Sequence, residues 1–420
     1  MDKGNLALVS HGPLSSGQWK LESVTPRAIK DDELLIRMVA TGICRADIHF
    51  GDFPVQEAAT NPAAFYPRVM GHEGAGYVER VGSSVKGFKP NDPVLLSVLS
   101  CGKCYNCDAK HPAYCIKSFE CNFLGDQNVY AGHGNSSFDI AGAFFGQSSF
   151  SARAVVKERS VVNMNGLGVT PHDLQILAPL GCGVQTGAGA FTNIAKVQPD
   201  HDVAVLGVGG VGMSAIMVRS TWCFMPIYAL ASYAFKIIDS NWNSSIKAAA
   251  MIGCEVIIAI DNVPSRLEVA KSLGATHTID TSDSSIDLVS EVLKITDGRG
   301  VHTSLDTTGI QRLARQSWEF VRFHGKVLQV GLAKPDDRWN VSMADHMNTG
   351  RQIIGCIQGD SIPQIFLRDI VRWYLNGKFP VEKLVRSYPI GQWQQALEDM
   401  QNGTTIKPIL LWPDQVSPKI

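Results

Sequence analysis

Residues 203–212 read VAVLGVGGVG, four apolar residues that open directly onto a glycine-rich turn. An apolar run followed by G-x-G-x-x-G and then by helix-forming residues is typical of a strand, a tight turn and a helix. The glycines of such a turn let the backbone approach a dinucleotide pyrophosphate at the amino end of the helix. Here they are Gly207, Gly209, Gly210 and Gly212.

The pattern of apolar and turn-forming residues differs on the two sides of this stretch. Before residue 180, short apolar runs alternate with turn-forming residues, which favours a β-rich domain; examples are 33–39, 76–81 and 93–98. After residue 200, apolar runs alternate with helix-like stretches such as 265–273; the runs are 203–206, 256–260, 278–279 and 326–330. This alternation predicts an α/β fold with a doubly wound parallel sheet. A last apolar run, 408–411, predicts a further strand.

One segment interrupts the nucleotide-binding pattern. The acidic residue that contacts the adenosine ribose is expected about 20 positions after the turn. Asp261 lies in the right context but 49 positions after Gly212, and removing the 29 residues 218–246 leaves 20. We therefore interpret 218–246 as an insertion that interrupts the helix soon after its first turn. It represents either translated non-coding sequence, such as an unspliced intron, or a real excursion.

Composition and charge restrict the class of partner. Lys plus Arg number 38 and Asp plus Glu 39, which gives a net charge of −1. This balance favours a small-molecule substrate over nucleic acid or an anionic membrane. The apolar stretch 222–238 is 17 residues long and contains Pro226 and Lys236, so we do not expect it to span a membrane. Because no signal-peptide pattern begins the chain, we expect a cytoplasmic protein.

Four clustered cysteines form the first candidate metal site. Cys101, Cys104, Cys107 and Cys115 have the spacing C-x2-C-x2-C-x7-C. Four thiolates at this spacing can close the coordination sphere of one structural Zn²⁺. An iron–sulfur centre is an alternative, but no proline follows the last cysteine. A nucleic-acid-binding zinc module would need a basic face, which the composition does not supply.

Three further residues form a second candidate set: Cys44, His72 and Cys182, each in a glycine-bearing context. Two cysteines and one histidine leave a fourth position on zinc open, which is the pattern of a catalytic site. Such a metal can act as a Lewis acid on an alcohol whose carbon gives hydride to a nicotinamide. Asp47 is placed to orient a ligand. His49 could carry the released proton, or it could be an ordinary surface or core histidine.

Together these motifs resemble the zinc-containing medium-chain alcohol dehydrogenases. The run 71–76, GHEGAG, followed by Val81-Gly82, is similar to the zinc signature of that family. The resemblance implies a GroES-like catalytic domain over 1–183, completed by 345–420, around a Rossmann domain over 184–344. It also implies one catalytic and one structural zinc, and a homodimer or homotetramer.

The resemblance assigns further residues. Glu73 would lie at the catalytic zinc, and Asp47 would support a ligand. The expected NAD contacts are the four glycines of the turn and Asp261, Arg266, Arg45, Lys407 and Thr186. Asp261 favours NAD over NADP, because a carboxylate repels a 2′-phosphate.

Within the family, the stretches 144–150 (FFGQSSF) and 178–189 resemble the aryl, benzyl-type alcohol dehydrogenases. This favours aromatic or allylic primary alcohols. Ala46 departs from the family, whose members usually carry Ser or Thr there to pass on the proton of the alcohol. The alternatives are a zinc polyol or formaldehyde dehydrogenase, or a catalytically impaired relative that serves as a binding protein.

Overall fold

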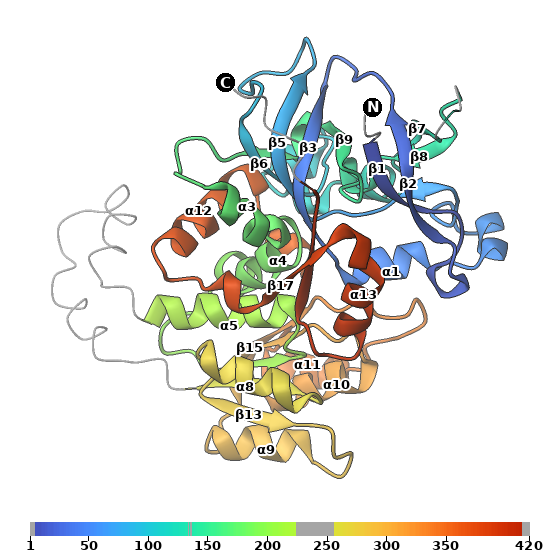
Figure 1. Cartoon of the computed structure of the whole chain (residues 1–420). Coiled ribbons are helices and arrows are strands. Elements are labelled where there is room, and N and C mark those ends of the chain that lie inside the picture. The colour runs from blue at the N-terminus through green and yellow to red at the C-terminus, as the bar shows by residue number, and fades with distance from the viewer. Residues whose placement is uncertain (1–4, 133, 135–136, 224–255, 414–420) are drawn as a thin grey trace. The chain divides into compact units, whose positions relative to one another are not determined.

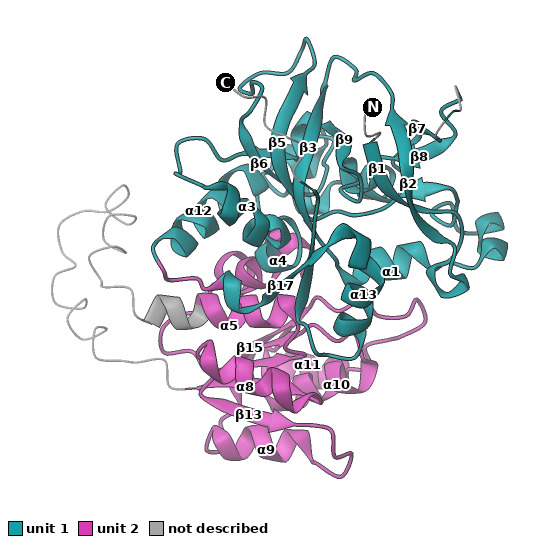
Figure 2. Cartoon of the chain, viewed as in Figure 1, with its two compact units in different colours: residues 1–185, 361–376, 381–420 teal, residues 186–360, 377–380 magenta. Residues whose placement is uncertain are grey.

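The computed structural model describes residues 5–132, 134, 137–223 and 256–413. The chain divides into two compact units (Figure 2). Unit 1 comprises Met1–Gln185, Ser361–Asn376 and Val381–Ile420, and unit 2 comprises Thr186–Asp360 and Gly377–Pro380. No helix within the described ranges has the length and apolar character needed to cross a membrane.

Unit 1 is rich in β-structure. Five strands close into a barrel in the order β1-β2-β7-β8-β4. They are β1 (Asn5–Ser10), β2 (Trp19–Pro26), β4 (Arg68–Val69), β7 (Asp126–Gly132) and β8 (Ile140–Gly142). A seven-stranded sheet has the order β10-β6-β5-β3-β18-β17, and β9 also pairs with β3. Its strands are β3 (Glu33–Gly42), β5 (Gly74–Val81), β6 (Pro93–Leu96), β9 (Arg153–Lys157), β10 (Val161–Asn163), β17 (Val385–Pro389) and β18 (Lys407–Leu411).

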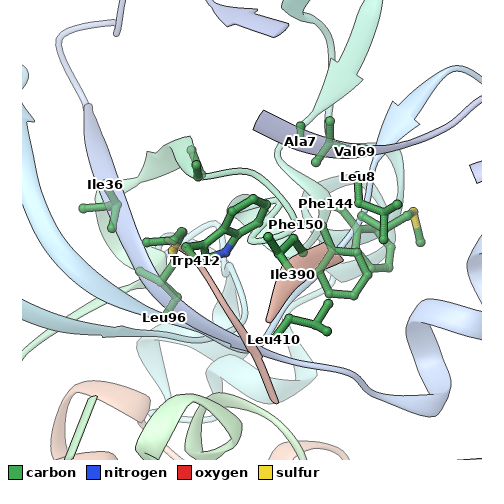
Figure 3. Packing of buried hydrophobic residues seen from close by; sticks show 14 of the residues in the cluster. Ala7, Leu8, Ile36, Val69, Leu96, Phe144, Phe150, Ile390, Leu410 and Trp412 are labelled. Carbon is green, nitrogen blue, oxygen red and sulfur yellow. The ribbon is translucent and has the colours of Figure 1, made fainter. Parts of the chain in front are cut away.

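Both ends of the chain contribute to the core of unit 1. Strand β18 pairs antiparallel with β3, although more than 360 residues separate them in sequence. Figure 3 shows Leu410 and Trp412 among side chains from the first part of the chain, including Leu8 and Phe150. The core therefore needs the C-terminal segment as well as the first 185 residues. The helices of unit 1 are α1 (Arg45–Gly51), α2 (Tyr105–Asp108), α3 (Pro171–Leu177), α12 (Pro363–Leu375) and α13 (Trp393–Gln401), and α4 (Gly183–Gly189) begins in it.

Unit 2 is built on a six-stranded parallel sheet with the order β13-β12-β11-β14-β15-β16. Strands β13 and β15 of this sheet are labelled in Figure 1. Its strands are β11 (Val203–Leu206), β12 (Ile257–Asp261), β13 (His277–Asp280), β14 (Val301–Asp306), β15 (Val321–Gln329) and β16 (Gln352–Gly355). Its helices are α5 (Gly210–Cys223), α8 (Pro264–Ser272), α9 (Leu288–Ile295), α10 (Gln311–Phe320) and α11 (Met343–Thr349). Numbered along the unit, the strand order is that of a Rossmann fold. The predicted α/β fold class, a β-rich part plus a doubly wound parallel sheet, is therefore confirmed.

Two details differ from the sequence-based expectations. Strand β16 pairs with β15 in the parallel sheet, so the residues from 345 to 360 lie in unit 2 rather than in the catalytic domain. Helix α5 continues unbroken to Cys223 rather than ending after its first turn. The reason is local, because no Gly or Pro follows Gly212 until Pro226. The rest of the proposed insertion, residues 224–246, lies outside the described residues.

Candidate metal centres and cofactor turn

The three predicted ligands come together in unit 1. Cys44 precedes α1, His72 precedes β5, and Cys182 precedes α4. Their ligand atoms and a carboxylate oxygen of Glu73 all lie within 4.8 Å of one another. His72 and Glu73 are buried, which keeps bulk water from these side chains.

The backbone at Gly71 allows His72 to reach this position. Gly71 has φ +88°, and a Cβ there would lie 2.5 Å from the backbone nitrogen of Phe150. Only glycine avoids both the left-handed strain and the clash. A side chain at residue 71 would therefore force this segment and Phe150 apart.

Asp47 orients His72. Its Oδ1 lies 2.8 Å from His72 Nδ1, and both side chains are buried. The Nδ1–H donates to the carboxylate, so the lone pair of Nε2 is directed to the other side of the ring, 3.2 Å from Cys182 Sγ. Asp47 also accepts hydrogen bonds from the backbone nitrogens of Cys44 and Gly71, which ties two ligand-bearing segments together.

Lys407 forms a buried ion pair with Glu73. Its Nζ lies 2.7 and 2.9 Å from the two carboxylate oxygens, and it also donates to the carbonyl of Ile43. Burial raises the pKa of Glu73 to about 7 against the opposing charge of Lys407. Burial lowers the pKa of Lys407, but the charge of Glu73 reverses this and holds that pKa above its usual range. The cation expected at the cofactor pyrophosphate therefore has its closest partner beside the candidate metal ligands.

The donor set fits zinc. Tetrahedral bonds of about 2.3 Å to sulfur and 2.0–2.1 Å to nitrogen separate neighbouring ligand atoms by about 3.5 Å. The separation of His72 Nε2 from Cys182 Sγ, 3.2 Å, is close to this value. The hydrogen bond with Cys182 holds the pKa of the Cys44 thiol well below its usual range; burial opposes this shift and the charge of Lys407 supports it. A thiolate is the form that binds metal.

The four clustered cysteines also lie together. Cys101, Cys104, Cys107 and Cys115 have their sulfurs within 4.8 Å of one another. The sulfur of Cys104 is 3.5 Å from that of Cys107 and 4.0 Å from that of Cys115, as four thiolates around one zinc require. Hydrogen bonds from the backbone of Cys107 and Ile116 lower the pKa of Cys104 to about 6. This loop is suited to a closed, structural zinc site.

Aromatic rings and an amide surround His72. The ring of Phe145 stacks on it with centroids 4.5 Å apart, and Phe144 meets it edge-on at 5.7 Å. Gln147 donates from Nε2 to the carbonyl of His72 and accepts the backbone N–H of Gly74. Sequence reasoning used 144–150 only as a family resemblance and gave Gln147 no role. The sequence feature that could have pointed to a role for Gln147 is its long polar side chain in a stretch of otherwise apolar and small residues.

The remaining predicted residues of unit 1 lie on or near α1. Arg45 and His49 are exposed and Ala46 is partly buried. The ring of His49 meets Phe50 and Phe53 edge-on, with centroids 5.1 and 5.3 Å away. An exposed imidazole at this place is accessible to solvent protons.

The predicted cofactor turn lies at the carboxyl end of β11 in unit 2. Gly207 has φ +81°, and no described heavy atom outside its immediate neighbours lies within 4 Å of the position of a Cβ on Gly209. This open space, directly before the amino end of α5, suits a phosphate. Asp261 is 7% exposed and accepts the backbone N–H groups of Val208 and Val263, so it reinforces the turn from the neighbouring strand.

Two other predicted cofactor residues also lie in unit 2. Arg266 Nη1 is 4.0 Å from Asp261 Oδ1, at the start of α8. Thr186 is buried in α4. Both residues therefore belong to the same unit as the glycine turn.

Known proteins share both halves of this arrangement. Residues 30–166 match the alcohol dehydrogenase GroES-like domain family, and residues 244–373 match the zinc-binding dehydrogenase family. A geraniol dehydrogenase from Castellaniella defragrans is 33% identical over 404 residues, covering 96% of this chain and 95% of that protein.

Two solved structures of alcohol dehydrogenases are similar to this chain over nearly its whole length. A zinc-binding-domain alcohol dehydrogenase from Burkholderia ambifaria has a TM-score of 0.82 and 34% identity, covering 97% of this chain and 99% of that one. Benzyl alcohol dehydrogenase from Acinetobacter calcoaceticus has a TM-score of 0.80 and 33% identity, with the same coverage. The fold, the donor sets and these likenesses together identify the chain as a member of the zinc-dependent medium-chain alcohol dehydrogenases, an enzyme family of oxidoreductases.

Proposed function

We propose that this enzyme uses NAD to interconvert aromatic or allylic primary alcohols and their aldehydes. The observation that carries the substrate class is the aromatic wall beside the candidate catalytic ligands. Phe145 stacks on His72, Phe144 lies edge-on to both rings, and Phe123 meets Phe145 edge-on at 5.3 Å. Flat, unsaturated substrates gain from such contacts, since aromatic pairs contribute about 0.5–1.5 kcal/mol beyond their buried area. The names of two relatives, geraniol and benzyl alcohol dehydrogenase, agree with this class.

Each side chain has a distinct part in the proposed mechanism. Cys44, His72 and Cys182 would hold zinc, with Glu73 close to them. The zinc would supply Lewis acidity toward the alcohol oxygen and NAD would supply the hydride acceptor. Asp47 keeps the proton of His72 on Nδ1, so that Nε2 remains a ligand. Lys407 neutralises Glu73, and the phenylalanine rings exclude water.

The proton of the alcohol must leave without a hydroxyl at residue 46. We propose that water passes it to the exposed His49.

Support for NAD comes from Asp261 at the end of β12. In Rossmann folds an acidic residue at the end of the second strand accepts the ribose 2′-hydroxyl and repels a 2′-phosphate, and Asp261 ends β12, the second strand of this sheet. Among the described contacts of Asp261, one cation opposes this preference for NAD. It is Arg266, whose Nη1 lies 4.0 Å from Asp261 Oδ1.

The test is a substrate panel followed at 340 nm. We expect benzyl alcohol and geraniol to exceed ethanol in kcat/KM, and NAD to exceed NADP. Replacing Phe145 by Leu should lower kcat/KM for benzyl alcohol by about tenfold and leave that for ethanol nearly unchanged. Preference for sorbitol or for the glutathione adduct of formaldehyde would contradict the substrate class. Zinc and NADH binding without turnover would show instead a binding protein.

A further inference from the structure

A cavity of about 330 Å³ lies in unit 2 at the amino ends of the parallel strands. His302 is the second residue of β14 and Arg322 the second residue of β15. The cofactor turn lies at the carboxyl end of β11, which runs parallel to β14, so the cavity is at the opposite edge of the same sheet. Nitrogen-bearing side chains dominate its lining: His201, His302, Arg322, His324 and Lys326.

A bulge in β15 builds one wall of the cavity. Val301 is opposite Val321, but Thr303 is opposite Lys326, so the residues between these pairs leave the regular ladder. His324 within this bulge has φ +64°, a conformation that is unfavourable for a side chain with a Cβ. Bulges often redirect side chains at binding sites. Here Arg322 and His324, which both lie in the bulge, line the cavity.

Two hydrogen-bond donors face each other inside the cavity. The backbone N–H of Asp202 donates to His302 Nδ1 at 2.9 Å, so the proton of the neutral ring is on Nε2. Arg322 Nη1 lies 2.5 Å from that Nε2. A guanidinium has no acceptor, and the imidazole nitrogen facing it is also a donor. An acceptor that receives both protons would resolve this conflict.

The ring of His302 is held in place for such a role. It stacks on His201 with centroids 4.3 Å apart and planes 6° from parallel. Burial, followed by the charges of Arg322 and His201, lowers the pKa of His302 to about 4. The ring is therefore neutral at pH 7 and donates from Nε2. Asp202, whose Oδ2 is 4.0 Å from Nδ1, lies on the other side of this ring from that donor.

We propose that this cavity binds a phosphate dianion, free or as a small phosphate monoester, separately from the cofactor. Phosphate oxygens accept from Arg322 and from His302 Nε2–H, and guanidinium–phosphate pairs are among the strongest charge-assisted hydrogen bonds. Lys326 adds a positive charge and is itself fixed by donation to the carbonyl of Ala195 at 2.8 Å. The volume exceeds that of inorganic phosphate alone, which leaves room for a short organic group.

The first experiment is calorimetric titration of the whole chain with inorganic phosphate and, separately, with glycerol 3-phosphate. Arg322→Gln should weaken binding at least about tenfold, and His302→Gln severalfold. The control is Arg315→Gln, an exposed arginine on α10 that pairs with Glu319 and should leave binding unchanged. Tighter binding of glycerol 3-phosphate would identify a monoester as the ligand, and tighter binding of inorganic phosphate would identify the free ion.

A second measurement locates the ligand without a substitution at the cavity. In chain labelled with ¹⁵N-histidine, phosphate should shift the His302 resonances and raise the pKa of that ring, because an adjacent anion favours the imidazolium. Phosphate binding that Arg322→Gln leaves unchanged, or that leaves the His302 signals unmoved, would overturn the proposal. If the Arg322→Gln substitution prevents folding, the histidine titration of the unchanged chain shows whether phosphate binds beside His302.

Discussion

His72 Nδ1 and Asp47 Oδ1 are 2.8 Å apart in a buried pair that fixes which ring nitrogen is available to a metal. Asp47→Asn keeps the shape of the side chain but removes its charge. We expect catalytic zinc affinity to fall about 10- to 100-fold, as is usual when the support of a ligand is removed. Competition with a chelator measures this.

The chain offers a matched control for Asp47. Both Asp47 and Asp173 are the third residue of a helix with a capping box, α1 and α3 respectively. Asp173→Asn should cost stability of about 1 kcal/mol and leave zinc affinity unchanged. Equal zinc loss in both variants would show that Asp47 acts only through its helix.

Residue 46 gives a gain-of-function prediction. Ala46→Thr introduces a hydroxyl two positions after the candidate ligand Cys44, as a group that passes on the proton of the alcohol, and we expect kcat for benzyl alcohol to rise about tenfold or more. Ala46→Val has the same shape without the hydroxyl and should not raise it. Stopped-flow single turnovers separate this step from product release. Identical rates for the Thr and Val variants would mean that the proton leaves by another route.

The cysteine cluster predicts a measurable zinc stoichiometry. Purified chain should contain two zinc ions, and Cys104→Ser should lose one of them and lower the Tm by several degrees. Cys121→Ser is the control, because Cys121 lies close in sequence but outside the group of four sulfurs. Loss of zinc from the Cys121 variant, or full zinc in the Cys104 variant, would contradict a structural site made by these four thiolates.

A buried carboxylate predicts how stability depends on pH. Glu33 is 1% exposed and receives hydrogen bonds from Arg27 and Lys157. Burial raises its pKa, but these bonds outweigh burial and lower the pKa from 4.5 to about 2. Because the folded pKa is the lower one, this stabilisation is complete above pH 4.5 and is lost as the pH falls toward 2. The shift corresponds to about 3 kcal/mol.

Glu33→Gln should therefore lower the free energy of unfolding at pH 7 by about 3 kcal/mol and flatten its dependence on pH below about 4.5. Glu22 forms a surface pair with His11, so Glu22→Gln should change the free energy of unfolding by less than about 1 kcal/mol. Urea unfolding at several pH values measures both. If the free energy of unfolding depended on pH in the same way for Glu33→Gln and for the unchanged chain, Glu33 would be ruled out as a source of acid sensitivity.

The sequence predicted features that depend on local pattern. The turn at Gly207, the parallel sheet and the four clustered cysteines follow from spacing and alternation. The set Cys44, His72 and Cys182 was instead predicted from glycine-bearing contexts and from the family resemblance. The sequence did not predict which side chain pairs with the buried Glu73. Lys407 was assigned to the cofactor, but in the structure its ammonium group pairs with Glu73, 334 positions away. The cavity at His302 was also missed, because a bulge inside β15 leaves no repeating pattern.

The shared core at the two chain ends bears on how the protein is made. A ribosome releases the residues of unit 2 before it has synthesised β18, the strand that pairs with β3. The parallel sheet of unit 2 can therefore form during synthesis, while unit 1 keeps an unpaired edge on β3 until β18 has been made. Lys407, the partner of Glu73, begins that same last strand, so the buried carboxylate gains its counter-charge only at that moment.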